Sequence, residues 1–168
     1  RYSPHDVSGL TKDDVKKLKL KWSFAFPNAL RARSQPTISM GAVFVGSQDG
    51  RVYAFDLETG CTKWVFSASA EVRTGIVLSA PSDQVSEKNP PLAFFGDLLG
   101  RAYAVNALNG KLVWSIRTDD HPSTTLTGTP AYYQGVLFIP ISSLEVVPAA
   151  DPNYSCCSFR GSLLAVNG

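Results

Sequence analysis

The chain has 168 residues, with 16 lysines and arginines against 14 aspartates and glutamates, so its formal net charge is only +2. This near balance argues against nucleic acid or an anionic membrane surface as the main partner. The 44% hydrophobic and 18% charged content is that of an ordinary folded domain, and no apolar run is long enough for a membrane-spanning helix. Enzymes and protein-binding domains are therefore the classes to distinguish.

One short helix is predicted near the N-terminus. Thr11 is a favoured N-cap residue. The acidic and basic residues after it complement the helix dipole, because the acidic ones come first: Asp13 and Asp14, then Lys16, Lys17 and Lys19.

The next segment, Leu20 to Phe26, resembles the tryptophan-bearing last strand of a repeat, but no earlier strands of that repeat precede it. Such an orphan strand can close a ring of sheets by completing a unit at the far end of a chain, so that no sheet edge is left open. We therefore predict that residues 1–26 contain the helix and an orphan outer strand.

The chain then repeats itself. The frame Ala-x-Asp/Asn-x-x-x-Gly-x-x-x-Trp occurs at residues 54–64 and again at 104–114, a displacement of 50 residues. Residues 46–53 and 96–103 match at the same displacement, and a third copy begins at Gly161. Self-similarity at this period indicates a stacked or radial repeat architecture.

Each repeat is predicted to form antiparallel strands, because glycine-containing turns separate short runs rich in Val, Phe, Tyr and Trp. Asn109-Gly110 is a strong hairpin signal. The predicted strands are Gln35 to Ser39, Ala42 to Ser47, Arg51 to Asp56, Cys61 to Ala68, Glu71 to Ser79, Pro91 to Asp97, Arg101 to Ala107, Lys111 to Thr118 and Leu126 to Tyr133.

The predicted fold class is all-β. Four strands per repeat of about 45–50 residues fit a β-propeller blade better than a sandwich, which does not require self-similarity. The expected blades are residues 27–68, 69–118 and 119–168, the third ending inside its frame. Because propellers have about four to eight blades, we expect a fragment of a longer protein.

Two adjacent cysteines, Cys156 and Cys157, interrupt the third repeat ahead of Ser158-Phe159-Arg160-Gly161. A bridge between them would be unusual, because consecutive Cα atoms lie about 3.8 Å apart whereas disulfides favour about 4.4–6.8 Å. Distorted backbone of that kind tends to occur at functional sites. From the residues alone, a vicinal disulfide and two reduced, buried thiols both remain open.

Other polar and aromatic positions have simpler structural explanations. Asp is a routine turn former, and the tryptophans of the repeat are expected to pack between sheets; these residues are Asp49, Asp56, Asp97, Trp22, Trp64 and Trp114. His5 and His121 lack a second ligand at zinc spacing, so no zinc site is predicted. Cys61 is expected to be buried in the last strand of its blade.

The repeated frame resembles the tryptophan-docking motif of quinoprotein propellers. Within that group, the string from Cys156 to Ser162 is similar to the branch that contains the polyvinyl alcohol dehydrogenases, as are Gly46-Ser47-Gln48-Asp49-Gly50 and Gly60-Cys61-x-x-Trp64. The resemblance implies an enzyme that oxidises alcohols with pyrroloquinoline quinone and calcium.

By this resemblance, Cys156 and Cys157 form a vicinal disulfide that stacks on the quinone, and Arg160 binds the cofactor. Glu145 is expected to contact the cofactor ahead of the disulfide, and Arg73 to face the central channel at the start of an inner strand. A planar anionic quinone needs a flat polarizable surface and fixed cations, which suits these residue types. The calcium ligands and the catalytic aspartate are expected in later blades.

The resemblance also implies partners and a location. We expect an alcohol substrate, a cytochrome c acceptor, further blades of the same propeller and a periplasmic or secreted location, since a disulfide needs an oxidising compartment. No haem-attachment motif occurs in the chain, so haem c would belong to a fused or partner domain. A non-catalytic scaffold propeller and a sensor or carbohydrate-binding propeller are the alternatives, although neither explains the cysteine loop.

Overall fold

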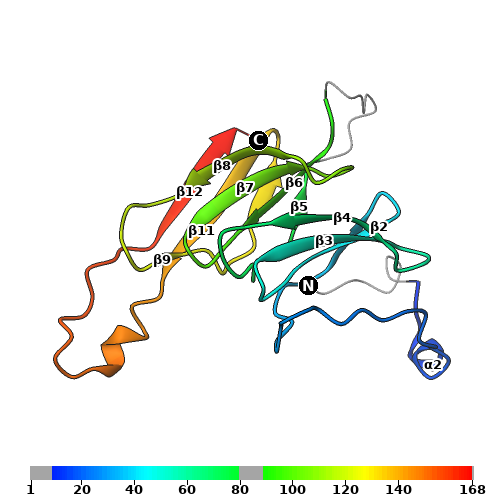
Figure 1. The fold of residues 1–168 in the computed structure, drawn as a ribbon, viewed down its shortest axis with the longest axis horizontal. Helices are drawn as coiled ribbons and strands as arrows, with labels where there is room; N and C mark the ends of the chain where they lie inside the picture. The colour runs from blue at the N-terminus through cyan, green and yellow to red at the C-terminus, as the bar shows by residue number, and fades with distance from the viewer. Residues whose placement is uncertain (1–8, 80–88, 168) are drawn as a thin grey trace.

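The computed structural model describes residues 9–79 and 89–167, which form three four-stranded antiparallel sheets packed side by side (Figure 1). The first sheet has the order β1 (Thr37–Ser39), β2 (Ala42–Gly46), β3 (Arg51–Asp56) and β4 (Thr62–Ser67). The second has β5 (Val77–Leu78), β6 (Leu92–Gly96), β7 (Arg101–Asn106) and β8 (Leu112–Arg117). The all-β repeat architecture predicted from the sequence is therefore confirmed.

The third sheet differs from the other two. Its strands are β9 (Thr124–Thr125), β10 (Ala131–Tyr133), β11 (Val136–Ser143) and β12 (Ser162–Asn167), and both β9 and β10 pair with β11. Strand β11 was missed in the sequence, although an apolar run follows the turn at Gln134 and Gly135. Of the predicted strand at 126–133, only the last three residues form a strand, β10; the short strand β9 lies just before residue 126, and the segment between the two has no strand pairing.

Alternation along each strand explains why the sheets stack. In β7, Ala102 and Ala104 face the third sheet, while Tyr103 and Val105 face the first. Successive side chains of a strand point to opposite faces. A sheet covered on both faces therefore needs apolar residues at consecutive positions, which is the pattern of β3 and β7.

An indole-over-glycine contact joins the first sheet to the second. The Trp64 side chain of β4 donates a hydrogen bond from Nε1 to the Ala107 carbonyl, at 3.0 Å. Its ring lies over Gly110, where an added Cβ would approach the ring to 2.8 Å. The glycine of the repeated frame is thus required by the tryptophan of the preceding sheet.

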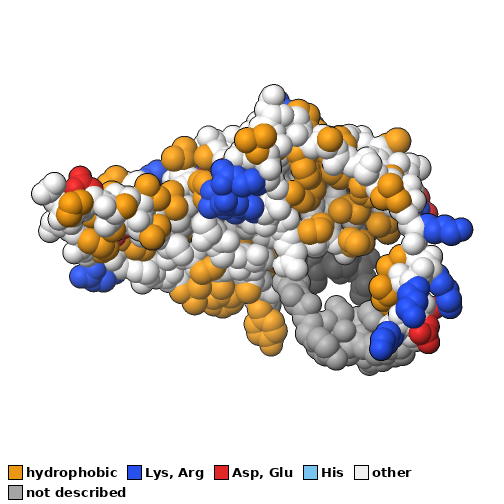
Figure 2. Space-filling model, turned by 90° about the horizontal axis from the view of Figure 1, so that it is seen from below, with side chains coloured by type: hydrophobic (Ala, Val, Ile, Leu, Met, Phe, Trp, Pro, Cys, Tyr) orange, Lys and Arg blue, Asp and Glu red, His pale blue; other side chains and the backbone are white. Residues whose placement is uncertain are grey.

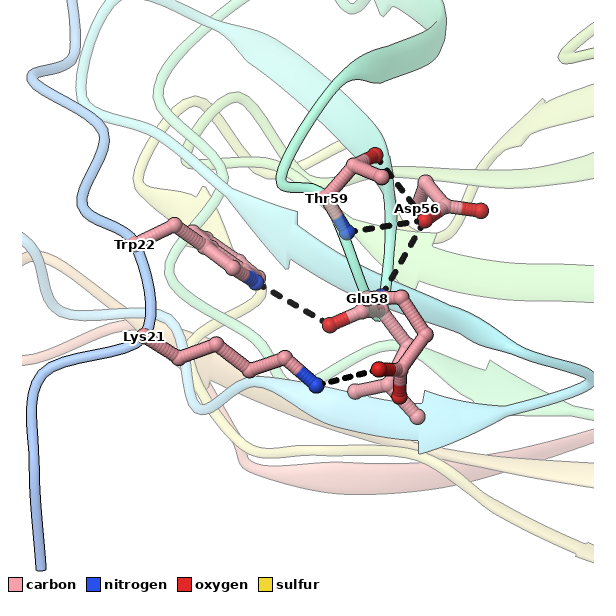
Figure 3. Close-up of polar contacts among 6 residues, drawn as sticks. Lys21, Trp22, Asp56, Glu58 and Thr59 are labelled. Carbon is pink, nitrogen blue, oxygen red and sulfur yellow. Dashed lines mark hydrogen bonds and ion pairs between the residues drawn. The ribbon is translucent and has the colours of Figure 1, made fainter.

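Trp22 makes the same contact on the first sheet (Figure 3). Its Nε1 donates to the Leu57 carbonyl at 3.0 Å, and its ring covers Gly60. Lys21 and Glu58 form an ion pair beside it. The segment containing Trp22 therefore docks on the first sheet through the same indole contact, but within the described residues it forms no strand ladder, and its role in closing a ring of sheets stays a prediction.

The predicted N-terminal helix is present but consists of one turn, α2 (Lys12–Val15). Thr11 is its N-cap, and the Thr11 and Asp14 side chains bond to each other's backbone N–H groups in a capping box. Lysine side chains surround this helix at the right of Figure 2. None of the helices in the described part of the chain is long and apolar enough to cross a bilayer.

Two residue-level expectations had different outcomes. Asp56 serves its turn as expected, since its Oδ1 accepts hydrogen bonds from the Glu58 and Thr59 N–H groups at 3.1 and 3.0 Å. The prediction that Cys61 is buried was wrong, because its thiol is exposed. Cys61 precedes β4, an outer strand in which only Trp64 is fully buried.

The docking contact can be tested with a matched pair of glycines. Gly110 and Gly135 both have positive φ, +72° and +81°, but only Gly110 has an indole where a Cβ would lie. We expect Gly135→Ala to destabilise the full-length protein by about 1 kcal/mol through backbone strain alone. Gly110→Ala should cost about 1–3 kcal/mol more, because it also displaces Trp64. Equal shifts of the urea unfolding midpoint would contradict the docking role.

Candidate functional site

A long loop, residues 144–161, joins β11 to β12 and carries the cysteine pair. The corresponding connections in the other repeats are tight turns, at 47–50 and 97–100. The loop contains a short 3-10 helix, η1 (Pro148–Ala150), and projects from the body of the molecule at the lower left of Figure 1. Cys156 and Cys157 are joined by a disulfide, with a cis peptide bond between them, and both are exposed. The predicted vicinal disulfide is therefore present.

Glu145, near the start of the loop, accepts hydrogen bonds from several other residues of the loop. Its carboxylate is 3% exposed and accepts hydrogen bonds from the Ser158 and Phe159 N–H groups at 2.9 and 3.0 Å. Hydroxyl groups of Tyr154 and Ser158 donate to the same carboxylate at 2.9 and 3.2 Å. Both carboxylate oxygens are therefore engaged by the segment that contains the disulfide. Contact between Glu145 and a cofactor stays a prediction.

These bonds determine the charge of Glu145. Burial by itself would raise the pKa, but the hydrogen bonds from Ser158, Tyr154 and Phe159 outweigh it and lower the pKa from 4.5 to about 2. The pKa of the Tyr154 phenol is raised, mainly because the phenol donates a hydrogen bond to Glu145 and also because it is desolvated. Glu145 is therefore an anion throughout the neutral range.

Arg160 lies just after the disulfide. Its Nη1 donates to the Cys157 carbonyl at 3.0 Å and to the Phe159 carbonyl at 2.9 Å, and the residue is exposed. Both hydrogen bonds found for this side chain among the described residues use Nη1. A fixed guanidinium beside a disulfide suits a planar anion, since Arg binds carboxylates as a rigid fork.

His121 joins the loop to the connection between β8 and β9. Its Nε2 lies 2.9 Å from the Ser158 Oγ, and its ring packs edge-on against Phe159 with centroids 5.3 Å apart. Phe159 is only 9% exposed and belongs to the core between the second and third sheets. The cysteine loop is therefore attached to the sheet core at its C-terminal end.

Arg73 lies apart from this cluster. It precedes β5, and its Nε and Nη2 donate to the two carboxylate oxygens of Glu71 at 2.9 and 3.1 Å. Within the described residues, no hydrogen bond connects it to the cysteine loop.

Strand pairing nevertheless places Arg73 and the loop at the same end of the strands. The end of β11 pairs with β9, and the Leu98 N–H donates to the Glu71 carbonyl at 3.0 Å. The same end of the strands therefore carries the turns after β2 and β6, the loop after β11 and the segments that lead into the inner strands. One loop contains four of the five predicted site residues: Glu145, Cys156, Cys157 and Arg160. Arg73 lies at the end of the strands from which that loop extends.

Sequence reasoning missed three members of the cluster: His121, Tyr154 and Ser158. Their polar types gave no signal by themselves, because their role depends on a carboxylate brought near by the loop. Across residues 9–79 and 89–167, no group of three or more His, Cys, Asp and Glu side chains could hold a metal ion, and His5 lies outside these ranges.

The lowered pKa of Glu145 gives a pH prediction. A group with a depressed pKa contributes its full stabilisation above its ordinary value and loses it as the pH falls through the folded pKa. The contribution of Glu145 should therefore be complete above pH 4.5 and lost toward pH 2. In protein labelled with ¹³C at glutamate carboxyls, the signal that disappears in Glu145→Gln should not move between pH 7 and about 4. A midpoint at or above 4.5 would contradict this assignment.

Comparison with known proteins places the chain in a family. Residues 6–147 match the family model PQQ_2, described as outer membrane protein assembly factor BamB. A polyvinylalcohol dehydrogenase of a Pseudomonas species is 37% identical over 99% of this chain and 25% of its own length. The 1-butanol dehydrogenase (cytochrome c) of Thauera butanivorans is 30% identical over 83% of the chain and 20% of its own length.

Solved structures agree on the fold. The quinohemoprotein alcohol dehydrogenase from Comamonas testosteroni superposes with a TM-score of 0.71 at 22% identity, over 92% of this chain and 22% of that one. The chain thus spans about a quarter of the length of the relatives it matches. With its stacked four-stranded sheets, its tryptophan-docking frame and these matches, the chain belongs to the PQQ_2 family of quinoprotein-type β-propellers.

Proposed function

We propose that the protein containing this chain is an alcohol dehydrogenase that uses pyrroloquinoline quinone, of the polyvinyl alcohol dehydrogenase kind. The observation that carries the proposal is the exposed Cys156–Cys157 disulfide, which is presented by a loop that replaces a tight turn of the repeat. Sheet stacking does not require a loop of this length, because the other two repeats stack with tight turns in its place. Its relatives named as alcohol dehydrogenases support the same conclusion.

The residues present suit part of a quinone site. Cys156 and Cys157 would form the surface on which the planar cofactor stacks, and Arg160 would pair with its carboxylates. Arg73, at the same end of the strands, is a second candidate cation, and its side chain forms an ion pair with Glu71. The cofactor would supply the two-electron acceptor for alcohol oxidation, while the protein binds and orients it.

Other parts of the proposed function lie beyond this chain. Calcium ligands and the base that removes the alcohol proton are expected in later blades. A cytochrome c acceptor is supported by the name of the Thauera relative. A periplasmic or secreted location is supported by the disulfide, because such bonds persist in oxidising compartments.

A scaffold propeller is the second candidate, and the description of the family model favours it. That match ends at residue 147, before the cysteine pair, whereas the alignment with the Pseudomonas dehydrogenase covers 99% of the chain. The segment that separates the two candidates is therefore the loop itself. A scaffold would retain the docking frame and have no requirement for Cys156, Cys157 and Arg160.

The test uses the full-length protein reconstituted with quinone and calcium. We expect alcohol-dependent dye reduction, and we expect the double variant Cys156→Ala/Cys157→Ala to lose about 100-fold or more of it, because the stacking surface and its fixed geometry disappear. Cys61→Ala removes an exposed thiol of the first sheet and serves as the matched control, with unchanged activity.

Intact mass before and after reduction should show the disulfide in protein folded under oxidising conditions. No alcohol-dependent dye reduction by the reconstituted wild type would reject the dehydrogenase and leave the scaffold. Free thiols at 156 and 157, or a double alanine variant as active as an active wild type, would reject the disulfide as the stacking surface.

A further inference from the structure

The Glu145 carboxylate holds the cysteine pair from both sides. Its hydrogen-bond donors are Tyr154, which precedes the pair, and Ser158 and Phe159, which follow it. The Cys156 N–H donates to the Tyr154 carbonyl at 2.8 Å, so the disulfide is linked directly to one of these donors. A single buried carboxylate therefore fixes both ends of the five-residue segment that ends at Ser158.

Glu145 is itself held at the end of β11. Its backbone N–H donates to the Ser143 Oγ at 2.9 Å, and that hydroxyl lies 3.3 Å from the carboxylate. Ser143 is the last residue of β11 and pairs with Thr124 of β9. The position of the carboxylate is thus determined by the sheet rather than by the loop.

His121 provides the second support. The Ser123 N–H donates to His121 Nδ1 at 3.1 Å, so Nδ1 is the acceptor and Nε2 carries the proton. Nε2 can then donate to the Ser158 Oγ, and the Ser158 hydroxyl can donate to Glu145. The donors run in one direction, from the histidine through the serine to the carboxylate. Asp119 accepts from the His121 N–H at 2.7 Å and keeps this corner in place.

We propose that Glu145 is the positioning residue for the Cys156–Cys157 platform, and that His121 completes the support through Ser158. Glu145 acts through the loop and not by touching the cofactor, since its two oxygens already accept bonds from Tyr154, Ser158 and Phe159. What the platform carries rests on the proposed function; that Glu145 holds the platform does not.

The experiment compares Glu145→Gln with wild type in the full-length protein, with Glu58→Gln as the matched control. Glu58 lies in an exposed turn and forms an ion pair with Lys21, and exposed pairs contribute little to stability. Two quantities decide the outcome: the rate at which dithiothreitol reduces the Cys156–Cys157 disulfide without cofactor, and the dissociation constant for pyrroloquinoline quinone. The KM for alcohol and the unfolding midpoint are measured beside them.

In Glu145→Gln an amide NH₂ group replaces one acceptor oxygen and opposes the N–H donors of the loop. We expect disulfide reduction to be about tenfold faster or more, and quinone binding to be weaker by a similar factor, because charge-assisted hydrogen bonds to a buried carboxylate are lost. The KM for alcohol in quinone-loaded enzyme should change little, whereas the urea unfolding midpoint should fall, because the stabilisation by the ionised, buried carboxylate is lost. Glu58→Gln should match wild type in all four quantities.

Ser158→Ala is the milder second variant, used if Glu145→Gln does not fold. It removes the Ser158 hydroxyl, which contacts both His121 and Glu145, and keeps the backbone N–H donors of Ser158 and Phe159. It should change the reduction rate and the quinone affinity in the same direction, by a smaller factor. Wild-type reduction rates in both variants would overturn the proposal. Weaker quinone binding with an unchanged reduction rate would also overturn it, because Glu145 would then contact the cofactor. If wild type binds no quinone, the proposed function fails, and the reduction rates still decide whether Glu145 positions the disulfide.

Discussion

The contact on which the architecture depends is an indole lying over a glycine of the next sheet. Trp64 covers Gly110 and Trp22 covers Gly60, each with an Nε1 hydrogen bond to a backbone carbonyl three residues before that glycine. The bond fixes the direction of the ring, and the missing Cβ permits its approach. Because both contacts recur with the repeat, sheets of similar sequence must stack with similar geometry.

The third repeat is the exception to this regular pattern, and it contains the candidate site. A turn of a few residues becomes a loop from 144 to 161, with exposed apolar side chains such as Val146 and Val147. Such a loop needs its own source of order, because it has no ladder partner. Glu145 supplies that order as a buried anion, and Phe159 supplies it as an apolar anchor in the sheet core.

The residues of the loop differ in their exposure to solvent. Cys156, Cys157 and Arg160 are exposed, whereas Glu145 is buried and both of its carboxylate oxygens accept hydrogen bonds. The loop therefore combines an exposed surface with a buried, hydrogen-bonded charge.

The sequence by itself determined the repeat, the strands and the docking frame, because each depends on local spacing: period-two alternation, turn glycines and a tryptophan at a fixed distance. It also marked the cysteine pair. The tertiary structure was needed to show that Glu145, His121 and Ser158 form one network, since His121 comes from the connection between β8 and β9 and the other two from the loop between β11 and β12. It likewise decided that Cys61 is exposed and that β11 forms, because burial and strand pairing depend on neighbouring sheets, which local pattern does not specify.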